Sequence, residues 1–195
     1  MRWGSRLGLA AMIVASPLAA QRTPGTGSMY EPFLTAVRDE NGNKVVEMVE
    51  KNGKGALNFR GIDGSTGLTI AAQRRLSVYL SYLLGSGADP DLPNGDGDTA
   101  LVIAARQGWD EGVDTLIANK ARVDATDRLG ETPLIVAVQS RQLNAVRKLL
   151  KAGADPDKTD RAAGYSARDY AKRDRRASDI LKLIEGAGTP AKPAG

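Results

Sequence analysis

The chain contains no cysteine and no histidine among its 195 residues. These absences exclude disulfides, metal sites built on thiolate or imidazole, cysteine nucleophiles and the Ser-His-Asp triad. A strong net charge is missing too. Arg2 and Arg6 lie in a segment that we expect to be removed, and without them the chain holds 25 basic and 23 acidic residues. A net charge of +2 gives no argument for binding nucleic acid. We therefore expect no metal site built on thiolate or imidazole and no nucleic-acid partner, and an enzyme is the least favoured class.

Long apolar runs are scarce, and the one near the amino terminus, residues 7–15, is too short to span a bilayer. Basic residues precede this run, and small residues suited to cleavage follow it at 16–20. This layout predicts a secretory signal peptide over residues 1–20, cleaved after Ala20, although an uncleaved anchor or a wrong start codon would also fit. No Asn-x-Ser/Thr sequon occurs, which favours a bacterial periplasm. We expect export to the periplasm, or secretion, with no membrane span after cleavage.

One short phrase recurs along the chain. It is GSTGLTIA at residues 64–71, GDTALVIA at 97–104 and GETPLIVA at 130–137, with a weaker copy, GYSARDYA, at 164–171. The leading glycines are separated by 33, 33 and 34 residues. This period is typical of stacked arrays, in which a unit buries its apolar face only against its neighbours.

Each repeat is predicted to contain two helices. Thr132 suits the N-cap of the first helix and Pro133 its first position, and Thr66, Thr99 and Ser166 are equivalent to Thr132. An aliphatic residue lies nine positions after the alanine of the phrase, and an aliphatic pair lies at twelve and thirteen, which places all three on one helical face. Glycines 87 and 153 then predict sharp helix ends, whereas Lys120 in the third repeat predicts a less sharp one.

A fifth, degenerate copy precedes the others, because residues 31–36, Val45 and Met48-Val49 fall at the same offsets. The 35 residues from Ala36 to Ala71 leave two extra residues in the connection at 53–57. The array is predicted over 29–185, with repeats at about 29–58, 59–91, 92–124, 125–157 and 158–185. A polar linker at 21–28 precedes it, and a disordered tail at 186–195 follows.

These units resemble the ankyrin repeat, most closely at residues 130–137, Val146, Leu149-Leu150 and 153–155. The resemblance implies an all-α ankyrin-repeat solenoid of about five helix-turn-helix units. It also implies projecting β-turn fingers and a concave groove lined by the first helices. Proteins of this family bind other proteins through these two surfaces and have no catalytic residues or cofactor of their own.

The resemblance also implies which residues face a partner. It places Ile62, Asp63, Ser65, Gly95, Asp96, Asp98, Arg128, Leu129 and Glu131 at the finger tips. It places Gln73, Arg74, Arg106, Gln107, Gln139, Ser140, Arg173 and Asp174 along the groove. Three guanidiniums in one groove, from Arg74, Arg106 and Arg173, would suit a carboxylate-rich partner, although an ordinary solvated surface is the alternative.

Trp109 has two interpretations, a core residue or an exposed hot spot for a partner. The acidic segment 89–98 resembles a calcium-binding loop in its composition. However, its alternation breaks at Pro93, and Ala100 stands where an EF-hand needs glutamate.

The sequence thus predicts a monomeric, non-enzymatic interaction module or scaffold that binds another protein in the periplasm. An immunity or inhibitor protein that masks a toxin or hydrolase is one alternative, and a secreted effector acting on host proteins is another. No feature of the sequence identifies the partner.

Overall fold

The computed structural model describes residues 29–187, which form eleven helices and, within that range, no strand. Five of them are the first helices of a repeat: α1 (Glu31–Arg38), α4 (Gly67–Gln73), α6 (Ala100–Gln107), α8 (Pro133–Gln139) and α10 (Ala167–Arg173). Five are the second helices: α2 (Gly42–Asn52), α5 (Ser77–Gly85), α7 (Asp110–Ala118), α9 (Leu143–Lys151) and α11 (Ser178–Gly186). The remaining one is the short α3 (Lys54–Leu57).

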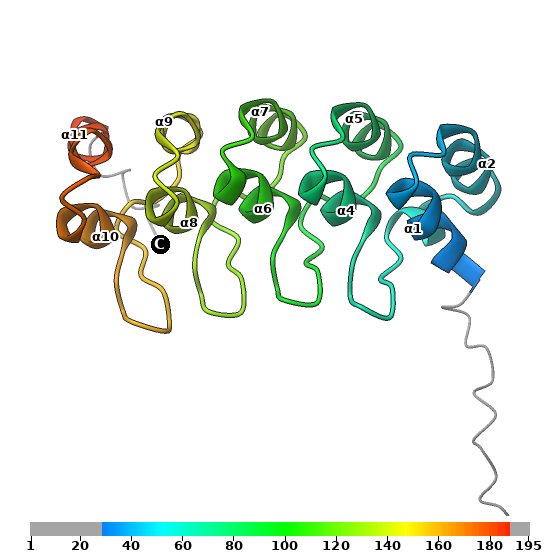
Figure 1. The fold of residues 1–195 in the computed structure, drawn as a ribbon, viewed down its shortest axis with the longest axis horizontal. Coiled ribbons are helices and arrows are strands. Elements are labelled where there is room, and N and C mark those ends of the chain that lie inside the picture. The colour runs from blue at the N-terminus through cyan, green and yellow to red at the C-terminus, as the bar shows by residue number, and fades with distance from the viewer. Residues whose placement is uncertain (1–28, 188–195) are drawn as a thin grey trace, which may run out of the picture.

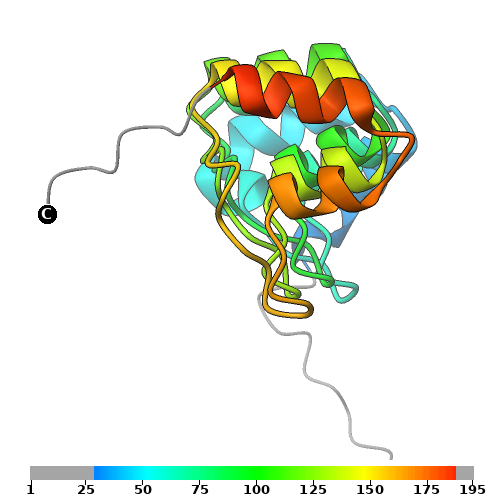
Figure 2. The same cartoon turned by 90° about the vertical axis from the view of Figure 1, so that its left-hand side faces the viewer.

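The helices stack as two parallel rows, one of first helices and one of second helices (Figure 1). A long loop projects from the first-helix row before each of α4, α6, α8 and α10. We call these loops finger 1 (59–66), finger 2 (92–99), finger 3 (125–132) and finger 4 (158–166). Viewed along the stack, the fingers superimpose and project to the same side (Figure 2). The predicted all-α solenoid of helix pairs with turn fingers is confirmed.

The predicted N-caps start four of the first helices. The hydroxyls of Thr66, Thr99 and Thr132 accept hydrogen bonds from amides three residues on, at 3.1, 3.3 and 3.2 Å. Ser166 does the same for the amide of Asp169, at 3.2 Å. Each bond satisfies a first-turn donor that has no partner inside the helix.

The core is continuous along the stack and follows the predicted periodicity. Leu80, Val113, Val146 and Ile180 are buried, and so are the alanines at 71, 104, 137 and 171 that bring the first helices close together. The first member of the aliphatic pair is buried in the regular repeats, whereas in the last repeat Ile184 is buried and Leu183 is only half-buried. Burial of a large aliphatic side chain contributes about 1.5–3 kcal/mol, so the stacked helix faces dominate the stability.

The third repeat contains a conformation that the sequence did not predict. Helix α7 spans nine residues, as α5 and α9 do, so the expectation of a less sharp end is wrong. Lys120 adopts a φ of 66°, in the region that favours glycine. This conformation lets the amide of Ala121 donate to the carbonyl of Leu116 at 3.0 Å, which closes the helix.

The ends of the array differ from its middle. The two extra residues in the first repeat allow α3 to form, and its Ala56 and Leu57 are buried. At the other end α11 includes Gly186, one residue beyond the predicted end of the array. The predicted signal peptide, the linker and tail residues 188–195 lie outside the described residues. Across the described range, 29–187, no helix combines the length and apolar character that crossing a membrane requires.

Candidate functional site

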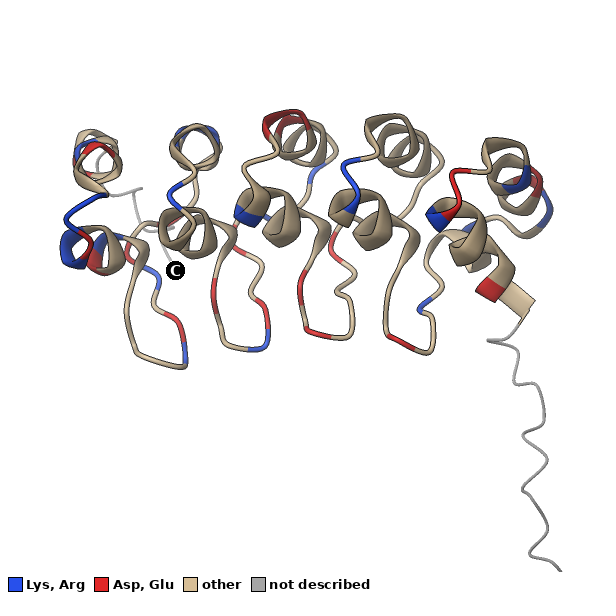
Figure 3. Cartoon of the chain, in the orientation of Figure 1, with Lys and Arg blue, Asp and Glu red and all other residues tan. Residues whose placement is uncertain are grey.

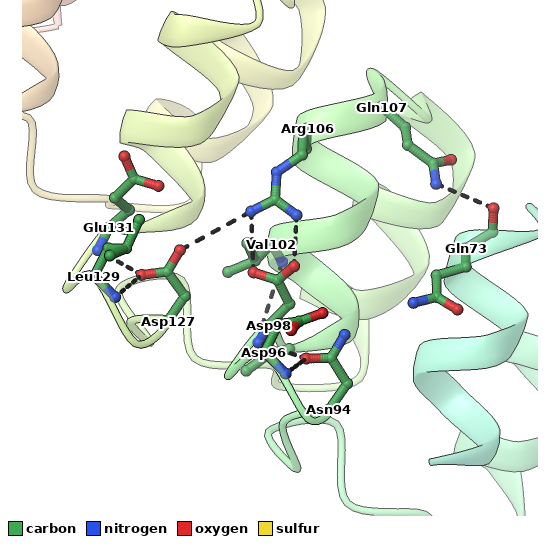
Figure 4. A network of polar contacts seen from close by, with 11 residues as sticks. Gln73, Asn94, Asp96, Asp98, Val102, Arg106, Gln107, Asp127, Leu129 and Glu131 are labelled. Carbon is green, nitrogen blue, oxygen red and sulfur yellow. Dashed lines mark hydrogen bonds and ion pairs between the residues drawn. The ribbon is translucent and has the colours of Figure 1, made fainter. Parts of the chain in front are cut away.

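The fingers are held in shape by three buried side chains that recur every 33 residues, Asn94, Asp127 and Asp160. The Oδ1 atom of Asn94 accepts from the amides of Asp96 and Asp98, both at 2.9 Å (Figure 4). Equivalent bonds in fingers 3 and 4 measure 2.7–2.9 Å. These three residues were not predicted from the sequence, although their 33-residue spacing and the tendency of Asx side chains to bond nearby amides could have identified them.

Finger 1 is built differently, because Gly61 stands at the equivalent position. Asp63 supplies the missing acceptor, and its Oδ1 takes the amide of Ser65 at 2.9 Å. This backbone hydrogen bond, together with the charge of Arg38, holds the pKa of Asp63 below its ordinary value. Arg38 of the first repeat lies 2.6 Å from the other carboxylate oxygen, so finger 1 is tied to α1.

The predicted tip residues divide into exposed and buried groups. Asp63, Asp96, Arg128 and Leu129 are exposed, and Glu131 is half-buried. Ser65 and Asp98 are buried, with relative exposures of 9% and 8%, so their prediction as partner-binding residues is wrong. Ser65 lies where the finger turns into α4. Asp98 is buried because its carboxylate is paired inside the protein.

The partner of Asp98 is Arg106, which joins two fingers (Figure 4). Its guanidinium makes two bonds to the Asp98 carboxylate, at 2.5 and 3.0 Å. It also lies 3.9 Å from the Asp127 carboxylate at the base of finger 3. The hydrogen bonds to Asp98 raise the pKa of Arg106 further above its usual value. The bidentate pair with Asp98 fixes the position and the angle of the guanidinium within its own repeat. The ion pair with Asp127 then lets Arg106 act as a clamp between repeats.

Glu131 and Gln139 lie beside this clamp, and the Gln139 amide donates to the Glu131 carboxylate at 2.7 Å. Burial raises the pKa of Glu131, and the nearby carboxylates of Asp127 and Asp160 add to the rise. Asp160 is held by the Tyr170 hydroxyl, which donates to its Oδ2 atom at 2.6 Å. That bond raises the pKa of Tyr170 to about 12. The side of fingers 3 and 4 is therefore crowded with negative charge.

The other two predicted groove arginines also have partners within the chain. Arg74 donates to the carbonyl of Arg38 and lies 2.8 Å from the Glu40 carboxylate. The Arg173 guanidinium lies over the Tyr165 ring, 4.4 Å from its centre. Each of the three arginines thus has an acceptor or a ring within its own or the adjacent repeat, although all three side chains stay partly exposed. A carboxylate-rich partner in this groove stays a prediction, and it would compete with these internal contacts.

Two of the predicted groove glutamines, Gln73 and Gln107, connect neighbouring repeats. Gln107 donates to the carbonyl of Gln73 at 3.1 Å (Figure 4). It accepts from Arg75 at its side chain and at its carbonyl, at 2.9 and 2.7 Å. Arg141 makes a similar link to Asp174 at 2.7 Å, while Ser140 is a half-buried C-cap of α8. The sequence analysis did not single out Arg75 and Arg141, because each bonds to a residue about 33 positions further on.

Trp109 belongs to the core, so its prediction as a partner-binding residue is wrong. Its exposed fraction is 8%, and it precedes α7 as the N-cap residue. The indole ring lies against Gly112 so closely that a Cβ added there would come within 2.1 Å of it. The absence of a side chain at Gly112 therefore lets the indole ring pack against the first turn of the helix.

The acidic segment 89–98 has a structural use. Asp89 accepts from the amide of Asp91 at 3.0 Å, and Asp91 accepts from both the amide and the side chain of Arg122. Within residues 29–187, no group of three or more potential ligand side chains is arranged to hold a metal ion. These carboxylates connect the second and third repeats.

The central part of the stack is similar to a known family of repeats. Residues 68–160 match a family model described as ankyrin repeats, in three copies. The matched range begins inside α4 and ends in finger 4, so it covers the regular central part of the stack. None of the curated proteins matches the chain.

Proposed function

Because residues 68–160 are ankyrin repeats and the flanking helix pairs continue the same stack, we propose a non-enzymatic scaffold that is exported to the periplasm. Ankyrin repeats are in general protein–protein interaction modules. In this proposal the protein binds a partner protein with its finger tips and the exposed ends of its first helices, which together we call the first-helix surface.

Two apolar side chains at the finger tips carry the proposal. Ile62 in finger 1 and Leu129 in finger 3 have exposed fractions of 93% and 54%, so they contribute little to the core. Large apolar side chains at rigid, projecting positions are typical anchors for a protein partner.

The rigidity of this surface supports the same proposal. Fingers 2, 3 and 4 are fixed by Asn94, Asp127 and Asp160, and finger 1 is fixed by Asp63. Neighbouring fingers are joined by Arg106 and by the amide of Arg161, which donates to the Leu129 carbonyl at 2.8 Å. Side chains and loops that are already ordered lose little conformational entropy on binding. The contact residues can therefore bind without first being rearranged.

A capture experiment tests the surface. The chain without residues 1–20 would be immobilised and used to isolate partners from a periplasmic extract, followed by affinity measurement with each purified partner. We expect Ile62→Ser with Leu129→Ser to weaken binding at least tenfold, because both anchors are lost. Val78→Ser is the matched control, because Val78 is 77% exposed but lies on α5 in the second-helix row. Equal affinity of the partner for the parent protein, the double variant and the Val78→Ser control would contradict the proposed surface.

Export needs a separate test, since it depends on residues 1–20. The full chain would be expressed in its bacterial host with a carboxyl-terminal tag, and the tagged protein would be recovered from cell fractions. We expect a periplasmic protein whose first residue is Gln21. An uncleaved protein in the cytoplasmic fraction would contradict export and would leave the interaction surface untouched.

A further inference from the structure

The charge of the described chain is divided between its two ends. Residues 29–140 contain 11 Lys or Arg and 16 Asp or Glu, a net charge of −5. Residues 141–187 contain 12 and 7, a net charge of +5. The last two repeats therefore form a basic end on a molecule whose described part has no net charge.

The basic end has a built surface on its second-helix row, away from the fingers. Two grooves of about 640 and 480 Å³ run along the two sides of α9. The first separates α9 from α7, and the second separates α9 from α11. Both grooves are bordered by Arg147 and Lys151, so these two cations stand on a ridge between them. We call this surface the α9 ridge.

Both grooves have apolar residues in their lining. Ile117, Ala118 and Ala152 line the first groove, and Leu150, Leu183 and Ala187 line the second. The three large side chains among them are half-buried rather than projecting. The grooves can therefore receive apolar side chains from outside, as holes between helices receive knobs.

The cations of the ridge are largely free of internal partners. Within residues 29–187, Lys151 makes no ion pair or side-chain hydrogen bond, and Arg147 has only the Asn144 amide oxygen, at 3.2 Å. Lys182 lies 3.3 Å from Asp179, but both side chains are about three-quarters exposed, so this pair contributes little. In Figure 3 the ribbon of α9 carries basic residues and that of the neighbouring α7 carries acidic residues. One of those acids, Asp114, is already held by Lys148.

We propose that the α9 ridge is a second docking site, which binds an acidic amphipathic helix of a partner protein. The apolar face of that helix would fill the two grooves, and its carboxylates would meet Arg147, Lys151 and Lys182. Charge complementarity selects such a partner, because the ridge presents unpaired cations around apolar holes.

The geometry disfavours two other occupants. A bilayer is bound by apolar side chains that project into it, whereas those of the ridge are half-buried. The chain's own residues 188–195 contain Lys192 and no acidic residue, so they do not complement the ridge.

A designed peptide tests the site without knowledge of the natural partner. The probe is an 18-residue helical peptide with leucine on one face and glutamate elsewhere, and its control has lysine in place of glutamate. Binding would be followed by fluorescence anisotropy at low salt and by NMR shifts of backbone amides. We expect the glutamate peptide to bind, to shift amides of α9 and α11, and to lose affinity as salt rises. The lysine peptide should not bind.

Charge reversal locates the contact. Arg147→Glu with Lys151→Glu should weaken binding of the glutamate peptide at least tenfold. Lys51→Glu with Lys54→Glu changes the net charge equally at the other end of the stack and should leave affinity within twofold. Unchanged far-UV circular dichroism and thermal midpoints would show that both variants fold.

Several results would overturn the site: no shifts on α9, equal binding of the lysine peptide, or equal losses in both double variants. Binding to phosphatidylglycerol vesicles that the ridge variant abolishes, without peptide binding, would assign the ridge to a membrane instead. The variant Ile62→Ser with Leu129→Ser should bind the peptide normally, so the ridge and the first-helix surface can fail independently.

Discussion

Replacing Lys120 with glycine should stabilise the protein, because Lys120 holds a backbone conformation that suits glycine. Its φ is 66°, whereas Gly87 and Gly153 occupy the equivalent positions with φ values of 94° and 88°. The same helix-closing hydrogen bond follows all three, at 3.0 Å in each case. The lysine side chain is exposed and, within residues 29–187, makes no ion pair or side-chain hydrogen bond. Its loss therefore removes no contact.

The magnitude follows from two opposing effects. A left-handed conformation costs a non-glycine residue about 1–2 kcal/mol. Glycine also gains freedom in the unfolded chain, which offsets about 0.4–1 kcal/mol of that cost. We expect Lys120→Gly to raise the free energy of unfolding by about 1 kcal/mol, and the thermal midpoint by about 2–4 °C for a domain of this size.

Urea unfolding followed by circular dichroism measures the change, with the slope m checked for constancy. Lys120→Ala is the matched control, because it removes the charge and the long side chain but keeps the Cβ, and it should stay within 0.5 kcal/mol of the parent. Gly153→Ala should lower the free energy of unfolding by about as much as Lys120→Gly raises it. If Lys120→Gly gave no more stability than Lys120→Ala, the backbone conformation would not be the source of the cost.

Other predictions concern the polar network and the tryptophan. Tyr170→Phe leaves one oxygen of the buried Asp160 carboxylate without its donor, so we expect a loss of about 1.5–3 kcal/mol in urea unfolding at pH 7, whereas Tyr165→Phe should be nearly neutral. Trp109→Ala should cost about 3–5 kcal/mol, as truncation of a core aromatic does; normal stability with lost partner binding would restore the hot-spot interpretation. Burial raises the pKa of Glu131 above its value in the unfolded chain, so the folded state binds the proton more tightly. The ionised Glu131 therefore lowers the free energy of unfolding as pH rises past the pKa of this residue in the unfolded chain. Glu131→Gln should therefore stabilise the protein at pH 7, by at most about 1 kcal/mol for a partly exposed group. That gain should vanish at pH 3, where both states are protonated, and a gain that persisted there would refute burial as the cause.

The architecture could be predicted from the amino-acid sequence, because the features that specify it are local or periodic. Thr66, Thr99 and Thr132 start their helices as predicted, since a cap bonds only three residues away. The aliphatic residues at nine and twelve positions after the repeat alanine are buried in the regular repeats, since helical spacing alone puts them on one face. A 33-residue period then requires stacking, because no single unit encloses a core.

Which polar and aromatic residues remain available to a partner could not be predicted, because it depends on contacts that form when the repeats stack. Arg74 and Arg106 are engaged by carboxylates that folding brings beside them, as Glu40 and Asp127 lie in neighbouring repeats. Trp109 is buried because the backbone at Gly112 leaves room for its ring. Pairing across repeats joins residues about 33 positions apart in directions set by side-chain rotamers, and no local pattern encodes those directions. The stack thus follows from periodicity, whereas the free surface is what remains after the repeats have used their own side chains to hold one another.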